Sequence, residues 1–257
     1  MSWERRQFYL LKGVNKAIRD YEMIAEGDRI AVALSGGKDS LTLLQLLLAR
    51  QRTARERYEL CAVHVRHEAE ECGGPVDLAP LLAYLAQRGV ACEVATLESP
   101  GVARRERASP CFHCAWRRRK ALFQAAVARG CNKVAFGHHA DDIAQTTLLN
   151  LFFHGKVETM EPRVAFFEDQ LTVIRPLAYI REREIAAFAL AAGLPVVAQH
   201  CAGADRSQRE LMGQIIEQVG RVNRKVRINL FRAATRLPVA RPRHGGPGEG
   251  APPEEGE

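Results

Sequence analysis

The sequence predicts an α/β fold, a doubly wound parallel sheet with helices on both faces. Along residues 29–192, short apolar runs that contain β-branched residues alternate with longer runs of helix-forming residues. This alternation is typical of a parallel sheet whose strands are connected by helices. Ligands of such folds bind at the carboxyl ends of the strands, so we expect functional residues in the segments that follow strands.

The same patterns give the order of the elements. An amphipathic helix is expected at residues 8–24, and another directly follows the first strand. The expected strands are 29–34, 60–65, 90–94, 133–137 and 171–174. The further helices expected are 76–88, 115–129, 140–153 and 181–192, and residues 203–236 are expected to be wholly helical. The predicted parts are an N-terminal helical segment (1–28), an α/β domain (29–200), a basic helical C-terminal region (201–238) and a disordered, Gly- and Pro-rich tail (239–257).

Composition and charge narrow the classes of function. Hydrophobic residues make up 47% of the chain and charged residues 26%, as in ordinary globular proteins. No apolar run approaches the roughly 20 residues that span a membrane, so we expect a cytoplasmic protein without a membrane partner.

Basic residues cluster in residues 101–130 and 206–236, within a chain of net charge +7. The simpler interpretation is a pair of solvated helix faces, whereas the functional one is a polyanionic partner such as RNA. The candidate RNA-binding residues are Arg117, Arg118, Arg119 and Arg209.

Residues 35–40 have the sequence SGGKDS and lie between the first strand and its helix. A glycine pair at such a turn lets the backbone approach an anion closely, and the following helix start binds phosphate. Val32 stands where a Walker A loop has its first glycine, so the loop is of another type. Ser40 is expected to cap the helix. The candidate phosphate ligands are Ser35, Gly36, Gly37, Lys38, Asp39 and Ser40.

A second motif, GHHADD at residues 137–142, follows the fourth strand. In the predicted fold it lies beside the first loop at the same sheet edge. Its acidic residues and histidines are suited to capping a helix, to binding Mg²⁺ through phosphates, or to proton transfer. Gly137 and His138 are candidate nucleotide ligands, and Asp142 is a candidate catalytic residue.

The cysteines offer a possible metal site. Cys111 and Cys114 form a C-x-x-C pair, predicted to be a hairpin, and Cys201 follows 87 residues after Cys114. The spacing suits a structural zinc, a dithiol redox pair, or an iron–sulfur cluster with one open iron. Spacing by itself leaves these three interpretations open.

Taken together and in order, these motifs resemble the tRNA 2-thiocytidine synthetase family of PP-loop ATP pyrophosphatases. The resemblance covers about residues 8–236, including SGGKDS, the C-x-x-C pair followed by Arg118 and Arg119, GHHADD, and Cys201. It implies that the loop binds ATP with Mg²⁺, with Lys38, Asp39 and Asp142 as catalytic residues. It also implies a 4Fe–4S cluster on Cys111, Cys114 and Cys201.

The implied activity is ATP-dependent tRNA thiolation. The enzyme would adenylate C2 of a cytidine in the anticodon loop and replace its oxygen with sulfur, which a cysteine desulfurase or another donor supplies. A homodimer is compatible with the resemblance. The alternatives are a tRNA 2-thiouridine synthetase, a lysidine synthetase, which has no use for the three cysteines, and a zinc-stabilised RNA-binding protein with an inactive loop.

Overall fold

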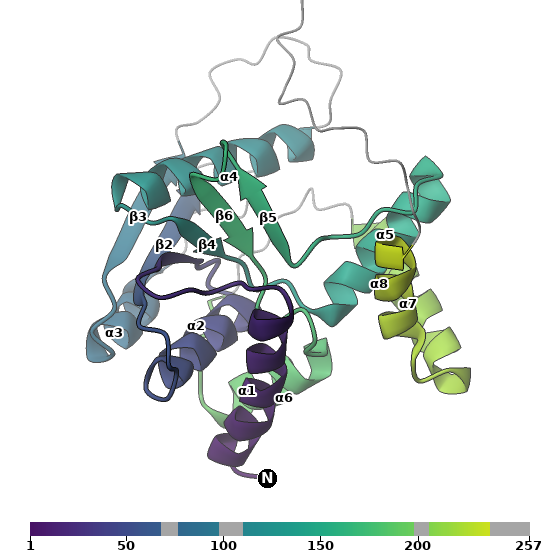
Figure 1. Ribbon diagram of the computed structural model, residues 1–257, viewed down its shortest axis with the longest axis horizontal. Coiled ribbons are helices and arrows are strands. Elements are labelled where there is room, and N and C mark those ends of the chain that lie inside the picture. The colour runs from purple at the N-terminus through teal and green to yellow at the C-terminus, as the bar shows by residue number, and fades with distance from the viewer. Residues whose placement is uncertain (68–76, 98–109, 198–205, 237–257) are drawn as a thin grey trace, which may run out of the picture.

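The computed structural model of the protein describes residues 1–67, 77–97, 110–197 and 206–236 (Figure 1). Its centre is a six-stranded sheet with the order β3-β2-β1-β4-β6-β5. The chain runs outward from β1 to β3, then crosses to β4 on the other side, so a crevice forms between β1 and β4. The strands are β1 (Arg29–Ala33), β2 (Glu59–His67), β3 (Cys92–Leu97), β4 (Lys133–Ala135), β5 (Arg163–Phe166) and β6 (Leu171–Ile174).

The predicted doubly wound α/β fold is confirmed, with one correction. All neighbouring strands are parallel except β5, which pairs with β6 in the antiparallel sense and makes the sheet mixed. The sequence prediction missed β5 because its turn carries no glycine. Instead, Phe167, Glu168 and Asp169 adopt positive φ angles. Residues other than glycine rarely adopt this conformation, so the sequence did not indicate a turn here.

Helices cover both faces of the sheet (Figure 1). One core cluster joins α1, α2, α3 and α6 to buried strand residues such as Ile30 and Val32. A second cluster joins α4 to the opposite face, where Ala31 and Val134 are buried. The helices are α1 (Trp3–Asp20), α2 (Lys38–Gln51), α3 (Ala79–Gln87), α4 (Pro110–Ala128), α5 (Ala140–His154), α6 (Glu182–Ala191), α7 (Arg206–Val222) and α8 (Val226–Arg236). None of the described helices is long and apolar enough to cross a membrane.

The C-terminal region packs on α5 rather than on the sheet. Ala144 and Leu148 of α5 form a small core with Met212 and Ile216 of α7. The expectation that residues 203–236 are wholly helical is wrong at residues 223–225, where the chain turns between α7 and α8; residues 203–205 lie outside the described part of the chain. The resulting helical hairpin brings α8 back beside α5, at the edge that carries the GHHADD motif (Figure 1).

Candidate functional site

The 35–40 loop joins β1 to α2 at the carboxyl edge of the sheet. Gly36 has a φ of +83°, and a Cβ atom there would lie 3.3 Å from the carbonyl oxygen of Val197. The N–H of Val197 donates to the carbonyl oxygen of Gly36 at 2.9 Å. Only glycine combines this φ with so close an approach. The loop is therefore fixed against the segment that leads toward Cys201.

The second motif packs directly against the same loop. A Cβ atom on Gly137, which follows β4, would lie 2.9 Å from backbone atoms of Asp39 and Ser40. Gly37, not Ser40, is the N-cap residue of α2, which corrects the sequence prediction. The Ser40 hydroxyl instead donates to the Gly37 carbonyl at 3.0 Å. The first amides of α2, which lack intrahelical partners, form an anion site beside the β4 loop.

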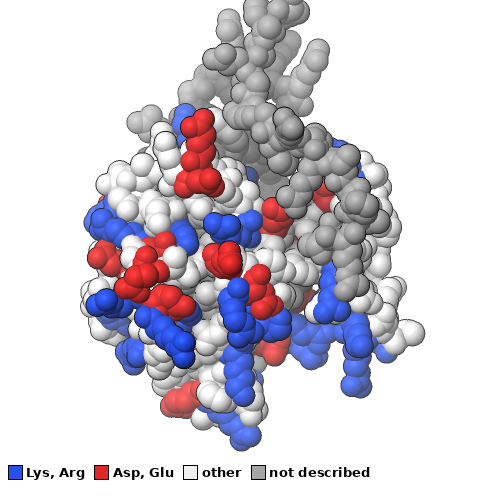
Figure 2. Space-filling model, viewed as in Figure 1, with Lys and Arg blue, Asp and Glu red and all other residues white. Residues whose placement is uncertain are grey.

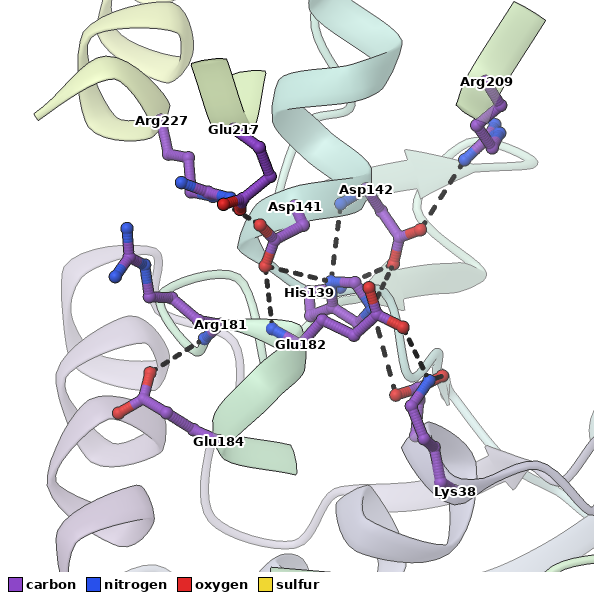
Figure 3. A network of polar contacts seen from close by, with 11 residues as sticks. Lys38, His139, Asp141, Asp142, Arg181, Glu182, Glu184, Arg209, Glu217 and Arg227 are labelled. Atoms are coloured by element: carbon purple, nitrogen blue, oxygen red, sulfur yellow. Dashed lines mark hydrogen bonds and ion pairs between the residues drawn. The ribbon is translucent and has the colours of Figure 1, made fainter. Parts of the chain in front are cut away.

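Lys38 is held between two carboxylates. Its Nζ lies 2.9 Å from Glu182 Oε1 and 3.1 Å from Asp39 Oδ2 (Figure 3). Burial disfavours the cation, but the two carboxylates outweigh burial and raise the pKa of Lys38. Lys38 therefore stays positively charged and is available to neutralise a phosphate.

Asp39 carries a buried oxygen that suits a cation. Its Oδ1 atom is buried and has no hydrogen-bond partner among the described residues. An unpaired buried carboxylate oxygen is costly unless a ligand satisfies it. Mg²⁺ is held in nucleotide sites by one or two carboxylates together with substrate phosphates. Asp39 fits that role.

Asp142 stabilises the start of α5 and also faces the site. His139 is the N-cap residue of α5, and Asp142 Oδ2 accepts the N–H of His139 at 3.0 Å, while the N–H of Asp142 donates to His139 Nδ1 at 3.4 Å. The other Asp142 oxygen lies 3.6 Å from a guanidinium nitrogen of Arg209. Asp142 thus has a structural role in addition to its predicted catalytic one.

His138 faces the crevice as a neutral base. Its ring stacks on Phe136 at a centroid distance of 5.4 Å, and Arg175 Nε donates to His138 Nδ1 at 3.3 Å. Burial, aided by the Arg175 cation, lowers the pKa of His138 to about 4. The ring is therefore uncharged near neutral pH and accepts a hydrogen bond through Nδ1.

These residues surround a pocket of about 320 Å³ at the β1–β4 crevice. The pocket lining contains five of the predicted nucleotide ligands, Ser35, Asp39, Ser40, Gly137 and His138, and also Asp142. The others, Gly36, Gly37 and Lys38, lie in the same loop. Arg118 and Leu122 of α4 complete one wall. The structure thus brings both sequence motifs and one predicted RNA-binding arginine to a single cavity.

The cysteine pair lies on a helix rather than in a hairpin. Since α4 begins at Pro110, Cys111 and Cys114 both fall in its first turns, which corrects the sequence prediction. The half-buried Cys114 is one helical turn from Arg118, which lines the pocket. Cys201 lies outside the described residues, within which no three His, Cys, Asp or Glu side chains gather to hold a metal ion.

The predicted RNA-binding arginines occupy two helices. Arg117 and Arg118 of α4 are partly buried and Arg119 is exposed, while Arg209 is an exposed residue of α7. Arg209 reaches Asp142, so the two helices approach the pocket from different sides.

A network of ion pairs and hydrogen bonds, in part exposed to solvent, connects the 35–40 loop to the C-terminal helices (Figure 3). The N–H of Glu182 donates to Asp141 Oδ2 at 2.7 Å. Arg227 of α8 bridges Asp141 and Glu217 through its guanidinium group. Burial opposes ionisation of Asp141, but these hydrogen bonds lower its pKa. Sequence reasoning missed Glu182 and Arg227, because their partners are 144 and 86 residues away.

Residues 10–218 match the family model described as PP-loop domain. Among solved structures, the U34-tRNA thiolase NcsA from Methanococcus maripaludis, determined with its [4Fe-4S] cluster, superimposes with a TM-score of 0.73 at 21% identity. The match covers 91% of this chain and 79% of NcsA. Fold and site therefore define a PP-loop protein.

Curated relatives narrow the assignment. A protein of Geobacter metallireducens named tRNA-cytidine(32) 2-sulfurtransferase is 39% identical over 94% of this chain and 93% of its own length. A protein of the same name from Verminephrobacter eiseniae is 39% identical over 81% of this chain and 66% of its own length. The chain belongs to the family of tRNA-cytidine(32) 2-sulfurtransferases. The predicted family resemblance is thereby confirmed.

Proposed function

We propose that this chain is an ATP-dependent tRNA sulfurtransferase that converts a cytidine of the anticodon loop to 2-thiocytidine. The relatives' name gives the position, cytidine 32. The observation that carries the proposal is the convergence of the 35–40 loop and the GHHADD motif on one pocket, beside an Asp39 carboxylate oxygen that has no hydrogen-bond partner among the described residues. This arrangement suits a nucleotide triphosphate with its cation.

The first step activates the base. The C2 carbonyl oxygen attacks the α-phosphorus of ATP, and pyrophosphate leaves with the electron pair of the broken P–O bond. Lys38 and the amides at the start of α2 stabilise the charge that develops on pyrophosphate. Asp39, with Asp142, would hold Mg²⁺ against the phosphates. The product is a C2–O–AMP group, whose phosphate makes the oxygen a good leaving group.

In the second step, sulfur attacks C2 and AMP departs with the original C2 oxygen. The neutral His138 lines the pocket and is suited to hydrogen bonding with the nucleotide or base. Arg118 also lines the pocket, where a guanidinium group is able to hold a tRNA phosphate. We assign Arg117, Arg119 and Arg209 to the same electrostatic surface.

We assign Cys111, Cys114 and Cys201 as ligands of a 4Fe–4S cluster. Cys114 is one turn from the pocket wall, and Val197, four residues before Cys201, is bonded to the 35–40 loop, so both segments approach the same edge. NcsA, the solved structure of similar fold, contains such a cluster. When bound, a three-cysteine cluster supplies an iron with an open position for the transferred sulfur. Oxygen-free protein should contain iron and labile sulfide, whereas one zinc without sulfide would exclude this assignment.

Nucleoside mass spectrometry tests the proposed function. Transfer RNA from a strain that lacks this protein should contain no 2-thiocytidine. The wild-type chain should restore the nucleoside, and the Lys38→Ala variant should not. Undiminished 2-thiocytidine in the deletion strain, or 2-thiouridine as the nucleoside that disappears, would contradict the proposal.

A further inference from the structure

A second pocket, the α6–α8 pocket, lies between the start of α6 and the facing ends of α7 and α8. Its volume is about 620 Å³, and its lining includes Arg181, Arg183, Arg221, Arg224 and Arg227. Figure 2 shows Lys and Arg side chains gathered at the lower right of the molecule, over the end where α7 turns into α8. None of the sequence motifs pointed to a cavity here.

The pocket has a net positive charge that its own carboxylates do not cancel. Asp141 and Glu217 are both engaged by Arg227, and Glu182 is engaged by Lys38. Within the described part of the chain, the other four arginines of the lining form no ion pair. Five arginines against three carboxylates leave the described lining with a net charge of +2, which attracts a polyanion to this concave surface.

Chemistry and shape favour a phosphodiester backbone as the occupant. Guanidinium groups form paired hydrogen bonds with phosphate oxygens. Arg183, Arg221 and Arg224 are exposed and come from two separate elements, so they can bind successive phosphates rather than one small anion. The described lining holds no hydrophobic residue that would pack against a protein partner, because it consists of one glycine and eight charged residues.

We propose that the α6–α8 pocket binds the tRNA backbone at a distance from the base that reacts. This inference rests on the proposed function, since tRNA is the polyanion that function supplies. The pocket shares Asp141, Glu182 and Arg227 with the network that ends at Lys38. Backbone phosphates bound there therefore lie against the same group of residues that contacts Lys38 of the 35–40 loop.

The test is the affinity of unmodified tRNA for the full-length, cluster-loaded protein, measured by fluorescence anisotropy over a range of salt concentrations. The double variant Arg221→Glu/Arg224→Glu should bind tRNA at least about tenfold more weakly at low salt. The slope of log affinity against log salt should become shallower by roughly one for each tRNA phosphate that the variant no longer binds. Arg221→Lys/Arg224→Lys, which keeps the charge, should retain most of the affinity.

Arg52→Glu is the matched control. Arg52 is exposed at the far end of α2, about 20 Å of helix away from the phosphate loop. This control should bind tRNA as the wild type does, and all variants should bind ATP normally. An unchanged tRNA affinity and salt slope in the double Glu variant would overturn the proposal.

Assaying thiolation in parallel separates this proposal from the proposed function. Thiolation by a double Glu variant with wild-type tRNA affinity would reject the pocket and leave the function standing. Arginine-dependent tRNA binding by a wild-type protein that thiolates no tRNA would support the pocket and reject the function. If Arg52→Glu weakened tRNA binding as much as the double Glu variant does, the proposed pocket would be rejected, because the loss would then reflect the overall charge of the protein.

Discussion

The ion pair between Lys38 and Glu182 should compete with ATP. Lys38 must exchange the Glu182 carboxylate for a nucleotide phosphate, so the pair is broken when ATP binds. We therefore expect Glu182→Gln to bind ATP more tightly than the wild type. Removing the Glu182 charge also removes repulsion of the phosphates, which acts in the same direction.

The size of the expected gain in ATP affinity follows from the solvent exposure of Lys38 and Glu182. The Nζ–Oε1 distance is 2.9 Å, but the side chains are 31% and 50% exposed, so solvent screens the attraction. Pairs of this kind contribute about 0.2–1 kcal/mol, which corresponds to a gain in ATP affinity of roughly 1.4- to 5-fold.

Isothermal titration calorimetry with ATP and Mg²⁺ measures this change directly. Glu184→Gln is the matched control, because Glu184 lies on the same turn but accepts the N–H of Arg181 instead of contacting Lys38. The control should bind ATP as the wild type does. Weaker ATP binding by Glu182→Gln would refute the reasoning, since it would mean that Glu182 positions Lys38 for ATP.

Three further variants test other parts of the site. Gly137→Ala should lose most ATP binding in the same titration, because its Cβ would lie 2.9 Å from the Asp39 backbone. Circular dichroism should show that the variant remains folded. Near-normal ATP affinity would show that the 35–40 loop tolerates the displacement. The lowered pKa of His138 means that the unfolded chain binds a proton before the folded one does. The stability that neutral His138 contributes is present above about pH 6.5 and is lost toward pH 4. The denaturant concentration at the midpoint of unfolding should therefore fall as the pH is lowered from about 6.5 to about 4, and it should fall less in His138→Gln. The same pH dependence of the midpoint in both proteins would contradict the lowered pKa of His138. Cys201→Ala should keep ATP and tRNA binding but form no 2-thiocytidine, whereas thiolation by this variant would exclude the three-cysteine cluster.

The fold and the conformation of the 35–40 loop were predictable because their signals are local. A glycine pair between a strand and a helix has few structural meanings, and Gly36 does adopt the positive φ that glycine permits. The GHHADD motif was placed correctly because the carboxyl ends of β1 and β4 meet at one sheet edge. Short motifs and the hydrophobic periodicity of strands and helices were therefore enough to predict these parts of the structure.

Other features depend on contacts that no local pattern encodes. The start of α4 was missed because the cysteine spacing suggested a hairpin, although Pro110 at the first helical position signals a helix start. The partner of Lys38 is 144 residues away, and that of Asp141 is on α8. Such pairs are fixed by the packing of α6 on α2 and of α8 on α5, which only the folded structure reveals.

The proposed chemistry is adenylation of the C2 oxygen of a tRNA cytidine. An isotope experiment tests it most directly. A tRNA carrying a heavy oxygen isotope at C2 of the target cytidine is incubated with ATP, the cluster-loaded protein and a sulfur donor, and the AMP is analysed by mass spectrometry. We predict one heavy oxygen in the phosphate of AMP for each 2-thiocytidine formed. Thiolated tRNA accompanied by AMP without the label would contradict the claim.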